Sequence, residues 1–199
     1  MNLFYNKESV GDVAFLQIEP TTGEFTYETK GNVVEIHQGN QVVGYNIFDA
    51  SNVSSISGNG HVQLNETLIN ELQQAIKNAG FSFELETDLS PKLVVGYVAN
   101  KEKHPNADKL SVLNVDVATE KLQIVCGAPN VEAGQKVVVA KVSAVMPNGM
   151  VIKDAELRGV ASSGMICSMK ELNLPNAPQE KGIMVLSDDY KVGQAFFEE

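Results

Sequence analysis

The sequence predicts two domains, a small α+β domain followed by a five-stranded Greek-key β-barrel with short helices. Charge predicts the division: residues 1–90 hold 12 acidic side chains against three lysines, a net charge of −9, whereas residues 91–199 hold 12 basic and 13 acidic groups. The pattern also changes, from β-rich segments with one helix to short strands separated by turns of Gly, Pro and Asn. Because Pro91 ends any preceding helix, we expect domains over residues 1–87 and 88–199.

Composition narrows the class of protein. The 199 residues carry a formal charge of −10 and are 43% hydrophobic, which is ordinary for a globular protein and excludes a generic basic coat for nucleic acid. No stretch approaches 18 consecutive apolar residues, and the N-terminus lacks the order of charges and apolar residues typical of a secretory signal. We therefore expect a cytoplasmic protein without membrane segments.

The acidic domain is expected to be a sheet covered by one helix. Residues 12–18 and 25–48 are β-rich and broken by Gly-Asn turns, which predicts three or four antiparallel strands. Asn65 is a suitable N-cap for a helix whose apolar residues repeat at helical spacing up to Ala79, and Gly80 is expected to close it. We assign this domain an unknown role.

The histidines of the acidic domain indicate no metal site. His37 and His61 stand without a cluster of Cys, Asp or Glu at ligand spacing, so both are expected to be solvated or structural. The sequence accordingly predicts no metal and no cofactor.

Alternation of apolar and polar residues in the second domain predicts five strands. A closed barrel of five short strands is an oligonucleotide/oligosaccharide-binding (OB) fold, which binds ligands on its second and third strands and on the loops after the first and fourth. The strands are expected at residues 93–98, 113–117, 122–126, 137–142 and 150–157.

Basic side chains fall near two of the expected loops. The first loop is bracketed by Lys101, Lys103 and Lys109, and the later one is flanked by Lys153 and Arg158. Lysine charges and the arginine fork suit phosphate, although lysines in loops also serve solubility alone.

Three segments in fixed order add a resemblance. Lys-His-Pro-Asn-Ala-Asp-Lys-Leu (103–110), Gln-Ile-Val-Cys-Gly-Ala-Pro-Asn (123–130) and Leu-Arg-Gly-Val-Ala-Ser-Ser-Gly-Met-Ile-Cys-Ser (157–168) closely resemble the tRNA-binding domain of the bacterial phenylalanyl-tRNA synthetase β subunit. The same domain type occurs in bacterial methionyl-tRNA synthetases and in EMAP-type cofactors. The whole chain resembles the stand-alone YtpR-type tRNA-binding proteins.

This resemblance implies an RNA-binding site that includes Lys109. The placement of charge adds Lys101, Lys103 and Lys153 to the predicted RNA-binding residues. It implies that Arg158 contacts phosphate, that Ser162 and Ser168 bond the RNA backbone or sugar, and that Met165 offers an apolar face to a base. Three of these residues have a structural alternative. The Arg158-Gly159 pair can pin a turn, Met165 can belong to the barrel core, and Ser168 can cap a helix beginning at Met169.

The resemblance further implies a non-catalytic protein that recognises tRNA by shape and backbone. The alternative is a module for protein–protein docking or dimerisation with little affinity for RNA, and a synthetase or a ribosome-associated protein is a conceivable partner. A homodimer is conceivable through residues 172–197, although the apolar residues there equally suit the barrel's own core.

No catalytic residue is predicted. Cys126 and Cys167 are expected to be small buried hydrophobic residues, and no pattern places either beside a base. A cysteine nucleophile assisted by His104 is the remaining enzymatic hypothesis, but His104 better fits a role in structuring its loop.

Overall fold

The computed structural model describes residues 1–197. The chain divides into two compact units at Ser90 and Pro91, and each unit is described by itself below. Two units agree with the two-domain organisation that the charge distribution and the change in pattern predict.

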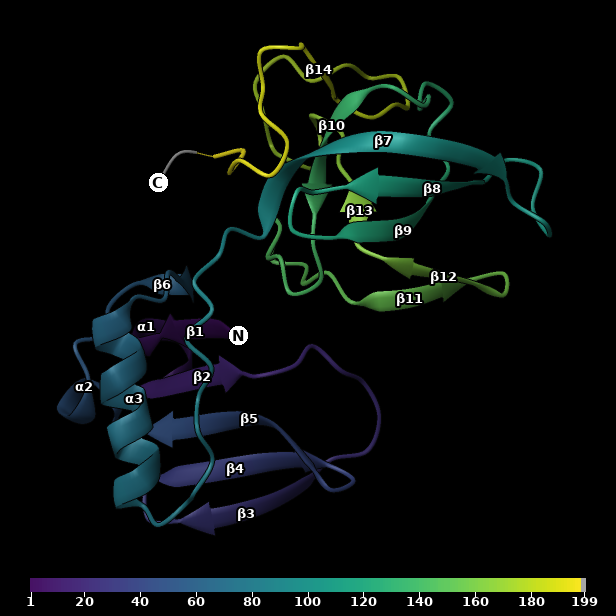
Figure 1. The fold of residues 1–199 in the computed structure, drawn as a ribbon. Coiled ribbons are helices and arrows are strands. Elements are labelled where there is room, and N and C mark those ends of the chain that lie inside the picture. Colours follow the sequence, from purple (N-terminus) through teal and green to yellow (C-terminus); the bar gives the residue numbers. More distant parts are fainter. Residues whose placement is uncertain (198–199) are drawn as a thin grey trace. The chain divides into compact units, whose positions relative to one another are not determined.

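The first unit is built on a six-stranded antiparallel sheet with the order β3-β4-β5-β2-β1-β6 (Figure 1). The expected β-rich segments form four strands, while the first and last strands of the unit were not predicted. Its elements are β1 (Asn2–Asn6), α1 (Lys7–Val10), β2 (Val13–Gln17), β3 (Thr26–Lys30), β4 (Val33–Gln38), β5 (Gln41–Phe48), α2 (Ala50–Val53), β6 (Asn59–Val62) and α3 (Glu66–Asn78).

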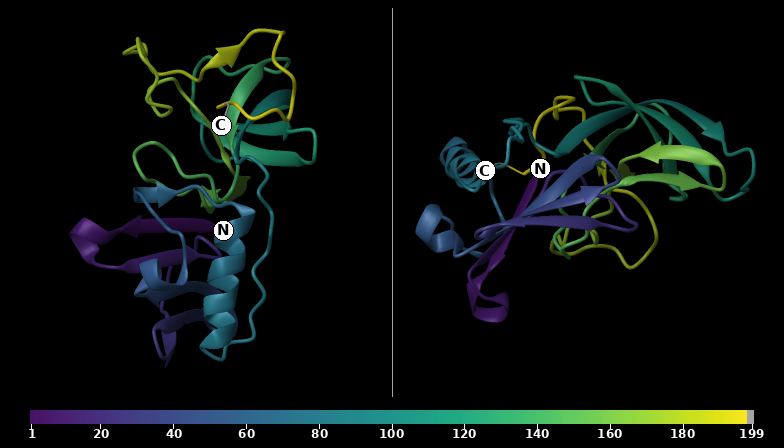
Figure 2. Two further views of the ribbon diagram at one scale, coloured as in Figure 1. Left: turned by 90° about the vertical axis from the view of Figure 1, so that its left-hand side faces the viewer. Right: turned by 90° about the horizontal axis from the view of Figure 1, so that it is seen from below.

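Helix α3 begins and ends where the sequence predicts. The Asn65 side chain accepts a hydrogen bond from the Leu68 amide at 2.8 Å, and Gly80, at a φ of +94°, follows the last turn. The apolar stripe of the helix, which includes the fully buried Leu72 and Ile76, packs against the sheet. Figure 2 shows α3 on one side of the sheet, end-on in the right-hand view.

The other face of this sheet carries aromatic side chains. Phe15 and Tyr27 are 36% and 65% exposed, and with Phe4 and Phe25 they line an open groove of about 360 Å³. The sheet of the first unit is thus covered by α3 on one face and exposes aromatic surface on the other.

The second unit contains a sheet with the order β13-β10-β7-β8-β9, with β14 also paired to β10 (Figure 1). Strand β12 packs against β9, and β13 also lies beside β9. The elements are β7 (Leu93–Lys103), β8 (Ser111–Asp116), β9 (Lys121–Cys126), β10 (Lys136–Ala140), β11 (Asp154–Leu157), β12 (Val160–Ser163), β13 (Met165–Ile166) and β14 (Val185–Leu186).

Two expectations for this unit need correction. The fifth strand, expected at residues 150–157, is shorter: only Asp154–Leu157 form β11, which pairs with β12 in a separate hairpin rather than with the main sheet. The helix expected from Met169 is a single turn, closed by the Leu172 amide on the Ser168 carbonyl at 3.1 Å.

The core of the second unit requires a glycine in its longest strand. A Cβ at Gly96 in β7 would lie 2.5 Å from the Val139 side chain and 2.8 Å from that of Val115, so any other residue there would clash with the neighbouring strands. The apolar residues of the C-terminal segment are buried in this unit as well, Ile183 in the cluster of Val115 and Val139, and Leu172 and Leu186 in a second cluster. Their burial agrees with the alternative that these residues belong to the core of their own domain.

Candidate nucleic-acid interface

The loop between β7 and β8 is held by a buried histidine. His104 is 5% exposed, and its Nδ1 accepts a hydrogen bond from the Asn106 amide at 3.0 Å. Because Nδ1 is an acceptor, Nε2 carries the proton and donates to the Leu157 carbonyl oxygen at 2.9 Å. His104 therefore structures its own loop and also fastens that loop to the end of β11.

A second bond joins the same two segments. The Asn106 side-chain amide donates to the Arg158 carbonyl oxygen at 3.0 Å. Arg158 and Gly159 form the β11–β12 turn, with φ angles of +49° and +85°. These angles are typical of a two-residue hairpin turn, in which Gly159 is unstrained. The first and third sequence segments, whose closest ends are separated by 46 intervening residues, thus meet at one end of the unit (Figure 1).

The second segment packs close to this end of the unit. A Cβ at Gly127 would lie 3.2 Å from the Leu110 side chain, so the glycine allows the residues after β9 to pass close to the end of the β7–β8 loop. Asn130 then bonds Ile183 twice, donating to its carbonyl at 3.1 Å and accepting from its amide at 2.9 Å. The three sequence segments therefore share one structural framework.

Three basic side chains are exposed on this framework. Lys103 ends β7, Lys109 lies in the β7–β8 loop, and Arg158 occupies the tip of the β11–β12 hairpin. The half-buried Lys153 directly precedes β11 and has an interaction of its own. The loop and the hairpin thereby present several cations at the same end of the unit.

Lys101 is placed differently from the expectation. Its ammonium group lies 2.9 Å from the Glu132 carboxylate and donates to the Val131 carbonyl at 2.8 Å. A lysine whose charge is paired and whose donors are used inside the unit contributes little to phosphate binding. Its role here is to fasten β7 to the segment that follows β9.

Ser162 and Ser168 also serve the fold. Ser162 is 3% exposed, and its hydroxyl accepts from the Val125 amide at 3.0 Å, which ties β12 to β9. Ser168 and Glu171 cap their turn reciprocally: the Ser168 amide donates to the carboxylate at 2.7 Å, and the Glu171 amide donates to the hydroxyl at 3.2 Å. Both serines thus have structural roles within the unit, and their assignment to RNA contacts stays a prediction.

Met165 is half-buried in β13 and packs against the core. Its neighbour Gly164 permits a close approach, since a Cβ there would meet the Ala140 carbonyl oxygen at 2.9 Å. The core alternative thus describes Met165 better than an apolar face offered to a base.

The outward face of β8 and β9 adds polar side chains that the sequence analysis did not single out. Asn114 and Gln123 are exposed partners on adjacent strands, and Gln123 donates to the Ala161 carbonyl at 2.8 Å. Their alternation with buried residues was visible in the sequence, but their place beside the hairpin depends on the packing of β12.

Acidic residues limit the positive charge of this region. Glu102, Asp108 and Glu156 are exposed next to Lys103, Lys109 and the hairpin turn. Asp154, also exposed, accepts a hydrogen bond from the Ser163 hydroxyl at 2.6 Å. The surface is therefore a mixture of charges, and any polyanion bound to it must be positioned by geometry as well as by attraction.

The cysteines are unsuited to nucleophilic catalysis. Both are free and buried. Burial raises the pKa of the Cys126 thiol, and burial together with the nearby Glu171 carboxylate raises the pKa of Cys167 to about 12. Both thiols are consequently protonated at neutral pH, and both ring nitrogens of His104 are already used in hydrogen bonds.

Among the described residues, no helix is both long and apolar enough to cross a membrane.

Two protein-family profiles match this chain. The sequence profile of the family described as "Putative tRNA binding domain" matches residues 93–195, and that of a domain of unknown function, DUF4479, matches residues 20–88. The three joined segments lie within the first of these matches. The protein therefore belongs to the class that carries this tRNA-binding-type domain.

Over 199 residues, the chain is 59% identical to "Putative tRNA-binding protein YtpR" of Bacillus subtilis, an alignment that covers 98% of this chain and 99% of the relative. The chain belongs to the YtpR family.

Two further relatives match a little more than half of this chain. The phenylalanine–tRNA ligase β subunit of Nitratidesulfovibrio vulgaris is 52% identical over 122 residues, which cover 58% of this chain and 15% of the relative. The same subunit of Oleidesulfovibrio alaskensis is 57% identical over 111 residues, covering 53% and 14%. The predicted resemblance to the synthetase subunit is thereby confirmed.

Proposed function

We propose that this protein is a non-catalytic tRNA-binding protein, and that it recognises the shape and backbone of tRNA through the end of the second unit where the β7–β8 loop meets the β11–β12 hairpin. One observation carries the proposal: His104 and Asn106 bond the carbonyls of Leu157 and Arg158. Segments that match a tRNA-binding-type domain in sequence are thus assembled into one surface.

We further propose that the second unit is an OB fold. In that fold the second and third strands, together with the loops after strands one and four, form the binding surface. Here β8 and β9 follow β7 in that order, the β7–β8 loop corresponds to the first loop, and the hairpin lies within the segment after β10. The contact of β13 with β9 supports a sheet that curls toward closure.

Within this surface, Lys103, Lys109 and Arg158 are the proposed phosphate contacts, with Lys153 beside them. Arginine and lysine reach phosphate oxygens through charge-assisted hydrogen bonds that carry no sequence information. Three or four such contacts give a slope of log K against log salt of roughly −2 to −4. Binding is therefore expected to be modest and sensitive to salt.

The test is fluorescence anisotropy of labelled bulk tRNA titrated with the full chain from low to physiological salt. Single-stranded RNA of the same length and duplex DNA serve as competitors. We expect folded tRNA to be preferred, and the Lys109→Ala/Arg158→Ala variant to bind at least about 10-fold more weakly with a salt slope shallower by about 2.

Lys191→Ala is the matched control. Lys191 is exposed, and the nearby Gly193 amide bonds the Val95 carbonyl at the start of β7, the opposite end of that strand from Lys103. This variant should bind tRNA like the unchanged protein. Equal losses of tRNA affinity in both variants would show that general charge attraction, without a defined site, accounts for the binding. An absence of preference for tRNA would favour a protein-docking module instead.

A further inference from the structure

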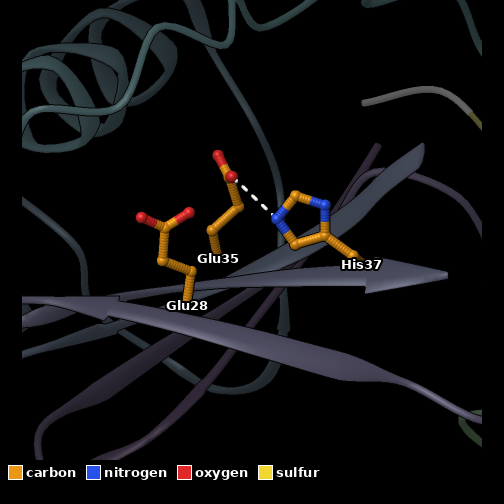
Figure 3. Close-up of side chains that lie close together, drawn as sticks. All are labelled: Glu28, Glu35 and His37. Atoms are coloured by element: carbon orange, nitrogen blue, oxygen red, sulfur yellow. Dashed lines mark ion pairs between the residues drawn. The ribbon is translucent and has the colours of Figure 1, made fainter. Parts of the chain in front are cut away.

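A histidine and two glutamates lie together on the helix-covered side of the first unit's sheet. Glu28 in β3 is the direct cross-strand partner of Glu35 in β4, and His37 follows two residues later on the same strand. One ligand atom from each of the three residues lies within 4.8 Å of the other two. Figure 3 shows the two carboxylates on the same side of the strands and the His37 ring turned toward Glu35.

Pairing between strands creates this cluster. Residues 35 and 37 share a face because side chains alternate along a strand, and the β3–β4 register brings Glu28, seven positions earlier than Glu35, to the same place. The sequence analysis found no ligand spacing around His37 because the third group is contributed across the hairpin.

The central carboxylate is fixed by the core. The Glu35 side chain is 9% exposed, and its Oε1 lies 2.8 Å from His37 Nε2. Its other oxygen accepts a hydrogen bond from the hydroxyl of Tyr45, which is fully buried. Such outer bonds are what orient carboxylate ligands in metal sites.

The charges around the cluster favour the binding of a cation. Two carboxylates directly opposite each other on adjacent strands repel. Lys30 lies 3.1 Å from Glu28 and offsets part of this repulsion, but its ammonium group also donates to the Gly80 carbonyl and lies 4.2 Å from the centre of the Phe81 ring. Lys30 is thus held toward the end of α3, on one side of Glu28.

We propose that Glu28, Glu35 and His37 bind a divalent transition-metal ion of the Zn²⁺ type. One imidazole nitrogen and two carboxylate oxygens suit Zn²⁺ better than Mg²⁺, which favours oxygen ligands and retains its waters. Water would supply a fourth ligand. The site stands in the first unit and does not depend on the proposed function.

The geometry requires only small movements. Donor atoms about 2.1 Å from a tetrahedral Zn²⁺ ion lie about 3.4 Å apart. The Glu35–His37 contact would widen from 2.8 Å, while the Glu28 side chain, which is 54% exposed, would turn inward. His37 would present its Nε2 lone pair to the metal instead of donating to Glu35. The ion would join β3, an edge strand, to β4.

The test is calorimetric titration of the tag-free full chain with ZnCl₂, followed by thermal unfolding with and without the ion. We expect one ion per chain, a higher Tm with Zn²⁺, and no comparable effect of MgCl₂. Glu28→Gln and His37→Gln should each weaken Zn²⁺ binding more than about 10-fold. Because Glu28 is largely exposed, its variant should fold normally and keeps the test decisive if His37→Gln unfolds.

His61→Gln is the matched control, because His61 lies in the same unit but packs against Phe4, with ring centroids 5.4 Å apart. It should bind Zn²⁺ like the unchanged chain. Zinc binding that survives Glu28→Gln, or an absence of any Zn²⁺-dependent heat or Tm shift, would overturn the proposal and leave the three side chains as an ion pair with a neighbouring acid.

Discussion

The two units of this chain gather their polar side chains in different ways. In the first unit, Glu28, Glu35 and His37 meet because two neighbouring strands are in register. In the second, residues far apart along the chain meet because His104 and Asn106 reach across to the hairpin carbonyls. A rigid sheet therefore carries the candidate site of the first unit, whereas linked loops carry that of the second.

The comparison also concerns charge. The first unit has a net charge of −9 and concentrates carboxylates, whereas the second has 12 basic and 13 acidic groups and exposes cations on its loops. If both proposals hold, the acidic unit would attract metal ions and repel polyanions, while the unit of mixed charge would bind phosphate. Each of the following predictions compares a substitution in one unit with a substitution in the other.

The largest expected effect comes from opening a cavity in one core. Leu72 and Ile124 are both fully buried, but they belong to clusters in different units. Leu72→Ala and Ile124→Ala should each lower the free energy of unfolding by about 2–5 kcal/mol. Hydrogen exchange followed by mass spectrometry should show lost protection only in the unit that carries the substitution. Equal loss in both units would show that they unfold together and would remove the basis of the comparison.

Removing the histidine that links the loops should have the next largest effect. His104→Ala leaves the Asn106 amide and the Leu157 carbonyl without their partner, at a cost of about 1–3 kcal/mol in the free energy of unfolding. The affinity for tRNA should fall as well, although His104 is buried and carries no proposed contact. His61→Ala, in the first unit, serves as control and should leave RNA binding intact. Unchanged tRNA affinity in the His104 variant would separate the link from the function.

The two capping residues should have smaller effects of different reach. Asn65→Ala removes the cap of α3, which covers the sheet, and should cost about 0.5–2 kcal/mol of stability, measured by urea denaturation. Ser168→Ala breaks the reciprocal cap with Glu171 and should cost about 1 kcal/mol at most, without a change in tRNA affinity. A clear loss of tRNA binding on Ser168→Ala would return that hydroxyl to the interface.

Over the accessible pH range the smallest effects are expected, and they should have opposite signs in the two units. Hydrogen bonds from Ser51 and Tyr5 hold the pKa of Asp12 below its ordinary value of 3.8, so the stability it gives the first unit is present above that value and is lost as pH falls. The raised pKa of Cys167 acts in reverse: its contribution is present below pH 9.0 and is lost as pH rises toward 12. Thermal unfolding at pH 3 and pH 10, with Asp12→Asn and Cys167→Ala for comparison, checks both signs. A variant that kept the pH dependence of the unchanged chain would rule out its group as the cause.

Local patterns in the sequence were sufficient for the elements with strong signals. The cap at Asn65, the closing Gly80 and the helical spacing between them predicted α3, and alternation predicted β8 and β9. Strand β6, which was missed, lacks such signals. β6 contains two polar residues and a glycine, and its pairing with β1 forms only when the whole sheet is assembled.

The candidate interface was predictable as a set of segments but not as a set of roles. The three segments meet in the structure as one framework, and Lys103, Lys109 and Arg158 are exposed there. Ser162 was indistinguishable by sequence from an exposed serine, because its burial depends on the packing of β12 against β9. The Glu28–Glu35–His37 cluster was missed for the same reason, since strand register decides it.

The bonds from His104 to Leu157 and from Asn106 to Arg158 span 53 and 52 residues of sequence. Contacts between residues so distant close a long loop, and the entropy of that closure is recovered only when the intervening strands are in place. The β7–β8–β9 meander can form from local contacts, but the surface at its end is completed only after the hairpin has been made and docked. During synthesis, the chain therefore cannot assemble this surface until β11 and β12 have left the ribosome. A nascent or truncated chain that lacks them can form the β7–β8–β9 strands but not the complete surface.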